Sequence, residues 1–309
     1  MTVAQVELTL GHADAVAALE RALLDGLDVE GCPPRSNVPV PAGELLLMPA
    51  AAGRYAGVKV AGVAPANPAA GLPRITGSYL LLDGPTLQPL ALLDGAALTA
   101  LRTPAVTALA VRALAAPDAR HLVLFGAGPQ ALGHLEALRA VLPGLDRVTV
   151  VARRPGPAAE LAARAAGAGL DAAVGTPGAV AGADLVVCCT TARTPLFDGA
   201  LVPDRAVVAA VGSHEPQARE VDAELVGRAD LFVEAREVAL REAGDLMMAG
   251  AGAERLVNLA ELVTGRAAVR HDRPRFFKSV GMAWQDLAVA AAQYAAVQRV
   301  AAVQRVAAG

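Results

Sequence analysis

Apolar residues repeat with two different periods along this 309-residue chain. Residues 12–25 carry them at helical spacing, and a longer pattern of the same kind covers residues 95–115. Between these segments, short apolar runs alternate with turn-forming Gly, Pro and Asn residues, which predicts four strands, at 44–48, 55–63, 75–82 and 87–93. Because no helical pattern separates these runs, we expect them to form an antiparallel sheet.

From Arg120 onward the pattern changes to strand followed by helix. Strand-like runs occur at 121–125, 147–152, 184–189, 206–211 and 230–233, and helical patterns lie between most of them. This alternation predicts an α/β domain with a doubly wound parallel sheet of the Rossmann type. The chain then ends in one helical stretch from Met282 to about residue 308, in which the hexapeptide AAVQRV occurs twice in tandem, at 295–300 and 301–306. We interpret that repeat as a helix extended by duplication.

The first strand of this second region leads into a glycine-rich loop. The apolar run 122–125 is followed by Gly126, Ala127, Gly128, Pro129, Gln130 and Ala131, and then by an Ala- and Leu-rich helical pattern. Gly126 suits a tight turn, Gly128 lets a pyrophosphate approach the backbone, and Ala131 lets the helix lie close to the strand. A helix N-terminus also offers free N–H groups to phosphates. We therefore predict a dinucleotide site, although a lone loop of this form also occurs as an ordinary strand-to-helix turn.

The residues after the second strand bear on which dinucleotide binds. NAD-binding domains usually place an acid there to hold the ribose 2′-hydroxyl. Here the strand ends in Ala152, Arg153 and Arg154, and the nearest acid, Asp146, precedes the strand. Two guanidinium groups suit a 2′-phosphate, so the sequence favours NADPH, with NADH possible. The alternative is that both arginines are only solvated.

Composition narrows the class of protein. The net charge is −3, so there is no basic footprint for nucleic acid. We see no signal peptide and no apolar run of ~18 residues, so we expect neither a membrane span nor secretion. The three cysteines, Cys32, Cys188 and Cys189, lack metal-ligand spacing and are interpreted as core residues of a reduced, cytoplasmic protein without a metal site.

Six stretches of the chain together resemble the ornithine cyclodeaminase/mu-crystallin family. They are Pro34-Arg35 leading to Leu47-Met48-Pro49; Gly57-Val58-Lys59; residues 97–103, ALTALRT; the Gly126 loop; Gly212-Ser213-His214-Glu215-Pro216 running to Arg219-Glu220-Val221-Asp222; and residues 277–281, FKSVG, with Asp286. The resemblance implies a homodimer of two-domain subunits. It implies a substrate-binding and dimerisation domain at 1–117, completed by 285–309, and a Rossmann domain at 118–284.

The resemblance also implies substrate-binding positions. Arg35, Lys59 and Arg102 match the family's carboxylate-binding residues, and an arginine fork is well suited to anchor a carboxylate. Lys59 lies between Val58 and Val60, and its side chain should therefore point to the opposite face of the strand. Thr76 lies near a polar family position on a neighbouring strand. Any of these cations could instead be solvated.

Three further residues are candidate cofactor contacts, of which Ser279 resembles a cofactor contact of the family. Thr190 and Gly212 fall at the carboxyl ends of later strands, where α/β sheets bind ligands, and Ser279 precedes the last helix. Each could equally be an ordinary turn or cap residue.

His214 is the position at which the chain departs from true ornithine cyclodeaminases, which carry an aspartate there after two glycines. The chain reads Gly212-Ser213-His214. An imidazole cannot hold a second ammonium as a carboxylate does, but it can donate a proton to an imine nitrogen. A loop-capping histidine is the structural alternative.

These features predict an NADPH-dependent ketimine reductase that acts on a small cyclic imino acid, Δ1-pyrroline-2-carboxylate or Δ1-piperideine-2-carboxylate. Arg35 and Arg102 would bind the carboxylate, and Lys59 or His214 would supply the proton. The alternatives are an alanine or opine-type amino-acid dehydrogenase, an ornithine cyclodeaminase with Glu215 as its carboxylate, and a non-catalytic NADPH- or ligand-binding protein like mu-crystallin.

Overall fold

The computed structural model describes residues 4–6 and 9–307. The chain divides into two compact units, Met1–Arg102 with Met282–Gly309 (unit 1) and Thr103–Gly281 (unit 2). The units part within one helix, α2 (Gly95–Leu114), whereas the domain boundary predicted at 117 lies beyond the end of that helix.

Unit 1 is built on a six-stranded sheet with the order β1-β6-β5-β4-β3-β2. Strands β2 to β6 pair antiparallel, as expected, and β1 adds a parallel strand at the edge. Two strands were not predicted: β1, and β2, which carries Pro39 and is exposed along most of its length. The elements of unit 1 besides α2 are β1 (Ala4–Val6), α1 (His12–Leu24), β2 (Ser36–Val40), β3 (Gly43–Ala52), β4 (Tyr55–Val63), the 3₁₀ helix η1 (Asn67–Ala70), β5 (Ile75–Asp83), β6 (Pro89–Asp94) and α9 (Ala283–Ala307).

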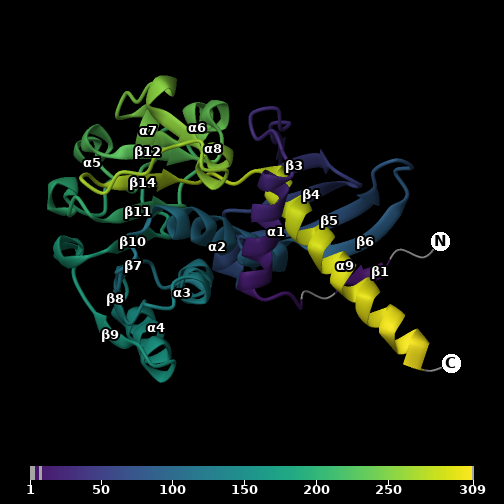
Figure 1. Ribbon diagram of the computed structural model, residues 1–309, viewed down its shortest axis with the longest axis horizontal. Coiled ribbons are helices and arrows are strands. Elements are labelled where there is room, and N and C mark those ends of the chain that lie inside the picture. The colour runs from purple at the N-terminus through teal and green to yellow at the C-terminus, as the bar shows by residue number, and fades with distance from the viewer. Residues whose placement is uncertain (1–3, 7–8, 308–309) are drawn as a thin grey trace. The chain divides into compact units, whose positions relative to one another are not determined.

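One face of this sheet is covered by α9, which packs on β3, β4 and β5, with α1 beside it (Figure 1). Residues that face α9 alternate with outward-facing ones, as the period of a strand requires. Met48, Tyr79, Leu81 and Leu93 are buried on this face. Trp284, the single tryptophan of the sequence, is buried at the start of α9. The last helix therefore completes the core of the first unit.

Unit 2 contains an eight-stranded sheet with the order β13-β12-β14-β11-β10-β7-β8-β9, and all its pairs are parallel. The chain moves from β7 to β8 and β9 on one side and then returns to place β10 and β11 on the other. The order therefore reverses between β7 and β10, and ligands of α/β sheets bind at such a point. The predicted fold class is confirmed.

The boundaries of the predicted strands in unit 2 agree closely with the structure, but β9, β13 and β14 were not predicted. Two of these are very short or mostly exposed, and β14 begins and ends in charged residues. The elements are β7 (His121–Phe125), α3 (Pro129–Val141), β8 (Arg147–Val151), α4 (Pro155–Gly167), β9 (Asp171–Val174), η2 (Pro177–Gly182), β10 (Leu185–Cys188), η3 (Gly199–Leu201), β11 (Val207–Ala210), α5 (Ala223–Arg228), β12 (Asp230–Val233), α6 (Arg236–Glu242), α7 (Gly244–Met247), η4 (Ala253–Arg255), β13 (Leu256–Asn258), α8 (Leu259–Val263) and β14 (Arg275–Lys278).

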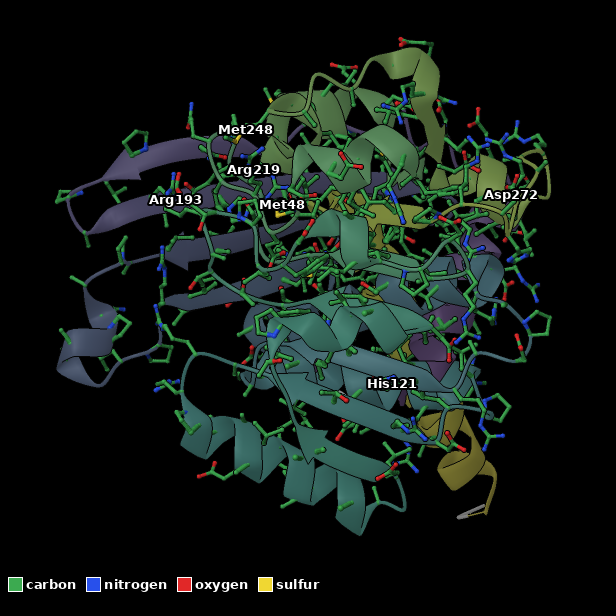
Figure 2. The ribbon with its side chains drawn as sticks, turned by 90° about the vertical axis from the view of Figure 1, so that its left-hand side faces the viewer. Met48, His121, Arg193, Arg219, Met248 and Asp272 are labelled. Carbon is green, nitrogen blue, oxygen red and sulfur yellow. The ribbon has the colours of Figure 1, made fainter. Side chains whose placement is uncertain are left out.

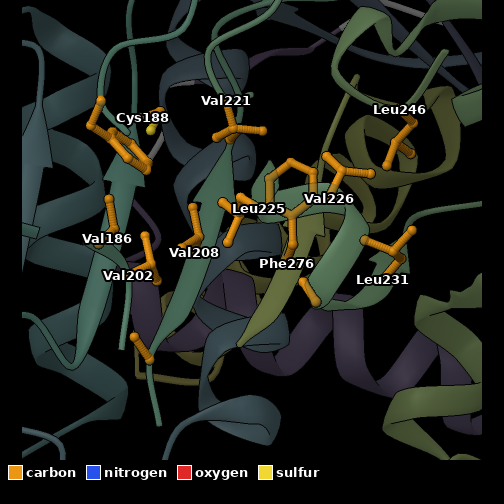
Figure 3. Close-up of a cluster of buried hydrophobic side chains, with 14 of the residues drawn as sticks. Val186, Cys188, Val202, Val208, Val221, Leu225, Val226, Leu231, Leu246 and Phe276 are labelled. Carbon is orange, nitrogen blue, oxygen red and sulfur yellow. The ribbon is translucent and has the colours of Figure 1, made fainter. Parts of the chain in front are cut away.

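A buried apolar cluster covers one face of the central strands of unit 2. Figure 3 shows Val186, Val208 and Phe276 of β10, β11 and β14 facing Leu225 and Leu246 of the helical layer. Because these strands are covered on both faces, their sequences are continuous apolar runs rather than alternating ones. The packing fixes the carboxyl ends of the strands, where the candidate cofactor residues lie.

The burial of helix α2 and of the cysteines refines two interpretations of the sequence. Helix α2 is long and apolar enough to cross a membrane, but 67% of that segment is buried inside the protein, as in the core helix of a soluble protein. Cys188 is a buried core residue as predicted, whereas Cys32 is only partly buried in a loop, where its Sγ donates to the Asp28 carbonyl (3.4 Å). Cys32 is therefore not a core residue, because the segment around Pro33 and Pro34 lies at the surface.

Candidate active site

The glycine loop follows β7 directly and begins with a backbone conformation that favours glycine. Gly126 has a φ of +111°, and a Cβ at this position would lie 2.6 Å from the Cys189 carbonyl oxygen. Gly128 caps α3, and a Cβ there would meet no atom within 4 Å. Ala131, in the first turn of α3, is fully buried. The loop is thus closely packed at Gly126 and open at Gly128.

This arrangement fits a dinucleotide pyrophosphate. Helix α3 opens with Pro129 and Gln130, and the N–H groups of its first turn have no partner within the helix. These residues follow Gly128 directly, at the strand-order reversal between β7 and β10. The residues present therefore suit the group that the sequence predicts.

Arg153 and Arg154 lie directly after β8, both exposed, and Arg154 is the residue that precedes the first turn of α4. Asp146 lies at the other end of β8, where it forms an ion pair with Arg120. The position that would hold a ribose 2′-hydroxyl through a carboxylate thus carries two arginines. Selectivity for NADPH stays a prediction.

A buried carboxylate that was not predicted to act connects the ends of β10 and β11. Glu220 is fully buried, and its Oε1 accepts hydrogen bonds from the Thr190 N–H (2.8 Å) and the Thr190 hydroxyl (2.7 Å). Its Oε2 accepts from the Gly212 N–H (2.7 Å). Burial raises the pKa of Glu220, and these hydrogen bonds together with the charge of Lys278 oppose that shift. Glu220 therefore brings together the two predicted cofactor residues Thr190 and Gly212.

A second set of buried acids supports the neighbouring strand ends. Asp245 accepts from the Glu220 N–H (2.7 Å), and its Oδ2 lies 2.8 Å from the Lys278 Nζ at the end of β14. Glu234, just after β12, accepts from the Ser279 hydroxyl (2.8 Å) and from the Gly281 N–H (2.9 Å). The hydroxyl of Ser279 is thus engaged inside unit 2. The contact between Ser279 and the cofactor stays a prediction.

His214 lies in the loop after β11 and is exposed in the structure. Next to it, the Ser213 hydroxyl donates to the Ala218 carbonyl (3.1 Å), which fixes the loop from inside. The Glu215 carboxylate accepts from Arg193 at 2.5 Å. Glu215 is therefore already paired with a cation within unit 2.

The predicted substrate residues of unit 1 meet around a buried carboxylate. Asp286, in the first turn of α9, is fully buried and receives the Lys59 Nζ at 2.8 Å and the Arg102 Nε at 3.3 Å. The Lys59 Nζ also donates to the Thr99 hydroxyl (3.3 Å), and the Arg102 Nη1 donates to the Gln285 side chain (2.8 Å). Lys59 and Arg102 are only 4% and 6% exposed. Two cations thus share one anion in a desolvated site.

The ammonium of Lys59 titrates near neutrality in this environment. Burial lowers its pKa from 10.5 to about 8. The Asp286 carboxylate opposes this shift, while the charges of Arg102 and Arg35 contribute to it. Arg35 lies just before β2, partly buried, and its charge therefore acts at Lys59. Such a group can donate a proton near neutral pH and recover it afterwards.

Thr76 and Tyr79, three positions apart in β5, lie on different faces of the sheet. Tyr79 pairs with Lys59, is fully buried, and its hydroxyl has no hydrogen-bond partner among the described residues. Burial, and the nearby charge of Asp286, raise the pKa of Tyr79 far above its usual value. Thr76 pairs with Gly62, three residues from Lys59, and is exposed. An offset of three places it on the opposite face, so the structure does not bring Thr76 to the Lys59 cluster.

Comparison with known proteins shows the family to which this chain belongs. Residues 1–300 match the ornithine cyclodeaminase/mu-crystallin family. The chain belongs to this family. It is 39% identical over 261 residues to a Δ1-pyrroline-2-carboxylate reductase of Burkholderia ambifaria, which covers 83% of this chain and 82% of that protein. The resemblance predicted from the sequence is confirmed.

Solved structures of the family agree with this fold. Thermococcus litoralis Δ1-pyrroline-2-carboxylate reductase, in complex with NADH and L-proline, is similar with a TM-score of 0.89 and 29% identity over 96% of each chain. An archaeal alanine dehydrogenase dimer with bound NAD is similar with a TM-score of 0.87 and 28% identity, covering 92% of this chain and 91% of that one.

Sequence reasoning assigned no role to Asp286, Glu220 or Tyr79. The first two lie inside stretches that resemble the family, which was the available signal, but an isolated acid in a sequence does not reveal its partner. Tyr79 carried a weaker signal, as one of three tyrosines in a chain with only 3% aromatic residues.

Proposed function

We propose that this protein is an NAD(P)H-dependent oxidoreductase that reduces a small cyclic ketimine carboxylate, Δ1-pyrroline-2-carboxylate or Δ1-piperideine-2-carboxylate, to the cyclic amino acid. The observation that carries the proposal is the buried cluster of Lys59, Arg102 and Asp286. It combines a fixed guanidinium, which binds carboxylates, with an ammonium that can release its proton. The Δ1-pyrroline-2-carboxylate reductases among the relatives support the same chemistry.

Reduction of a ketimine needs a hydride at the imine carbon and a proton at the ring nitrogen. A dihydronicotinamide cofactor, when bound, would supply the hydride. Arg102, held by Asp286 and Gln285, binds the substrate carboxylate, and Arg35 adds a second positive charge. Lys59 donates its proton to the ring nitrogen and becomes a neutral amine, which Asp286 keeps in place until it is protonated again. The products are the cyclic amino acid and the oxidised cofactor.

The cyclodeaminase alternative is disfavoured by charge. Ornithine brings a second ammonium, and burying it without a carboxylate costs several kcal/mol. His214 replaces the aspartate that would provide this partner, and Glu215 is engaged by Arg193. A protein that only stores a ligand would have no need for a buried lysine with a lowered pKa, which also speaks against the non-catalytic alternative.

One experiment tests the proposal against these alternatives. The purified protein is given NADPH with Δ1-pyrroline-2-carboxylate or its six-membered homologue, and separately NAD⁺ with ornithine. We expect cofactor oxidation with the imines and little ammonia from ornithine. Ammonia release at a rate rivalling imine reduction would establish the cyclodeaminase instead, and pyruvate with ammonia as a better substrate would indicate an alanine dehydrogenase.

NADPH is expected to bind more tightly than NADH because Arg153 and Arg154 stand where an acid would hold the 2′-hydroxyl. A charge-assisted hydrogen bond contributes roughly 1.5–3 kcal/mol, so changing both arginines to glutamine should weaken NADPH binding at least ~10-fold and leave NADH unaffected. Fluorescence titration of both cofactors measures this. Arg164→Gln, at an exposed site of α4, is the control, and equal affinities for both cofactors in the parent protein would contradict the prediction.

The pH dependence of imine reduction should follow the protonation state of Lys59. Its protonated form is the donor, so kcat/KM is expected to decrease above about pH 8, by about tenfold per pH unit. The opposite reaction needs the neutral amine and should become faster over the same range. A profile of kcat/KM from pH 6 to 10 in both directions checks the sign. Reduction that accelerates through pH 8 would exclude Lys59 as the donor.

The protein is proposed to act as a homodimer in the cytoplasm. Support comes from the dimeric archaeal relative and from the face of the unit 1 sheet that lies opposite α9. On that face Val38, Val60 and Leu92 are 40–42% exposed, an apolar surface typical of an interface. Light scattering in solution should give twice the mass of the 31.2 kDa chain, and a monomeric mass would contradict this expectation.

A further inference from the structure

A cavity of about 640 Å³ lies in unit 2 at the amino ends of β12 and β13. The parallel strands of this sheet carry the glycine loop, Thr190 and Gly212 at their carboxyl ends. The cavity therefore lies at the amino ends of the strands, whereas the candidate cofactor residues lie at their carboxyl ends. Its charged lining residues are Arg228, Asp230, Glu254, Arg255, Arg270 and Arg273.

The lining carries more positive than negative charge. Four arginines face two acids, in a chain whose overall net charge is −3. One acid is neutralised, because Asp230 receives Arg270 through two nitrogens, at 3.0 Å and 2.5 Å. Arg228 is paired with Asp204 (3.4 Å), so Arg255 and Arg273 are the lining arginines for which no ion pair shorter than 3.5 Å occurs among the described residues.

Arg255 is held in place by neutral backbone carbonyls. Its Nη2 donates to the carbonyls of Val226 (2.8 Å), Gly227 (3.2 Å) and Ala229 (3.2 Å), at the end of α5. These partners are neutral and use only one of the three nitrogens. Among the described residues no hydrogen bond from the Nε or Nη1 of Arg255 is found, so these N–H groups can donate to a ligand.

The loop that brings Arg270 and Arg273 to the cavity is organised from inside. Arg275 is fully buried, and its Nη1 donates to the Arg270 carbonyl (3.1 Å) and to the His271 Nδ1 (2.8 Å). Figure 2 shows the same loop at Asp272, which projects at the surface of unit 2. The hydrogen bonds of this buried arginine therefore hold the surface loop, and with it Arg270 and Arg273, in a defined position.

Arg273 provides a donor without an acceptor. Its Nε is buried and has no hydrogen-bond partner among the described residues, and the nearest carboxylate oxygen, from Asp272, is 3.7 Å away. The side chain as a whole is 42% exposed, but a buried N–H donor of this kind is unfavourable unless a ligand supplies the acceptor. An anion in the cavity would satisfy it.

We propose that this cavity is a second ligand site, which binds a small metabolite carrying two negative charges on phosphate or carboxylate groups. The forked guanidiniums of Arg255 and Arg273 match the oxygen atoms of such groups, and their two positive charges match a dianion. The volume exceeds that of inorganic phosphate and suits a phosphorylated or dicarboxylic metabolite.

Isothermal titration calorimetry with inorganic phosphate as the probe tests the site. The protein is first saturated with NADPH, so that phosphate cannot bind at the glycine loop, and ionic strength is held constant with chloride. We expect saturable binding of phosphate that Arg273→Gln weakens about tenfold or more. Arg266→Gln is the matched control, because Arg266 lies on the same loop and does not line the cavity. It should bind phosphate like the parent protein.

Two further arms complete the experiment. Arg270→Gln should also weaken phosphate binding, and circular dichroism verifies that each variant is folded. Succinate in place of phosphate distinguishes the two sources of the anion, because the tighter binder indicates the natural group. Equal affinities of the parent protein and Arg273→Gln, or no saturable binding of either anion once NADPH is bound, would overturn the proposal.

Discussion

Replacing Lys59 with methionine is expected to lower kcat for imine reduction by roughly 10²–10⁴-fold, the range for loss of a positioned general acid. Methionine keeps most of the buried volume but cannot donate a proton. Arg102 still reaches Asp286 in this variant, so the carboxylate anchor stays in place. Steady-state kinetics at saturating cofactor measures the loss, and cofactor titration should show unchanged affinity.

His214→Gln provides the matched comparison, since it removes the other predicted proton donor. His214 is exposed, whereas Lys59 is buried beside the anchor for the carboxylate, so we expect the histidine variant to retain most of its activity. If Lys59→Met stays within tenfold of the parent and His214→Gln does not, the roles of the two residues are reversed.

Asp286→Asn is expected to destabilise the protein by about 3–5 kcal/mol, the cost of removing one partner from a buried ion pair. The variant leaves the charges of Lys59 and Arg102 close together in a site from which solvent is excluded. Without the carboxylate the pKa of Lys59 falls below 8, because the group that opposes the effect of burial is lost. Reduction then weakens at neutral pH as well.

Urea unfolding followed by circular dichroism measures the stability change. Asp14→Asn is the control, because Asp14 is an exposed acid in the first turn of α1 in the same unit. That change should stay within about 0.5 kcal/mol of the parent. An Asp286→Asn protein as stable as this control would show that the two cations do not depend on the carboxylate.

The regular parts of the fold were predictable because their signals are local. The glycine loop joins a strand to a helix within a few residues, and the sequence identified the end of the strand at Phe125, although α3 already begins at Pro129. Lys59 pointing away from Val58 and Val60 followed from the period of a strand in the same way.

Contacts between distant segments were beyond such reasoning. The Lys59 Nζ and the Asp286 Oδ2 are separated by 227 positions in the sequence, and nothing near either residue specifies the other. Glu220 and Asp245 resemble surface acids when the sequence is examined, because their burial depends on how three strand ends pack. The same holds for the exposure of Thr76, because a resemblance to a polar family position does not determine which face of the sheet a residue occupies.

Strand β14 illustrates why short buried strands are missed. Arg275 and Lys278 begin and end it, and both are buried with tertiary partners. In a sequence, two charged ends around two phenylalanines suggest a surface turn. The strand can be buried because the tertiary partners of Arg275 and Lys278 compensate for the burial of their two charges.

Trp284 gives the protein an internal optical reporter. It is the only indole in the chain, buried one position before Gln285 and two before Asp286, on the turn that holds Arg102. Its emission maximum therefore depends on the polarity around that turn alone. A red shift on chemical denaturation, or in a variant that loosens the first turn of α9, can be assigned to this part of unit 1 without any label, because no second tryptophan contributes to the spectrum.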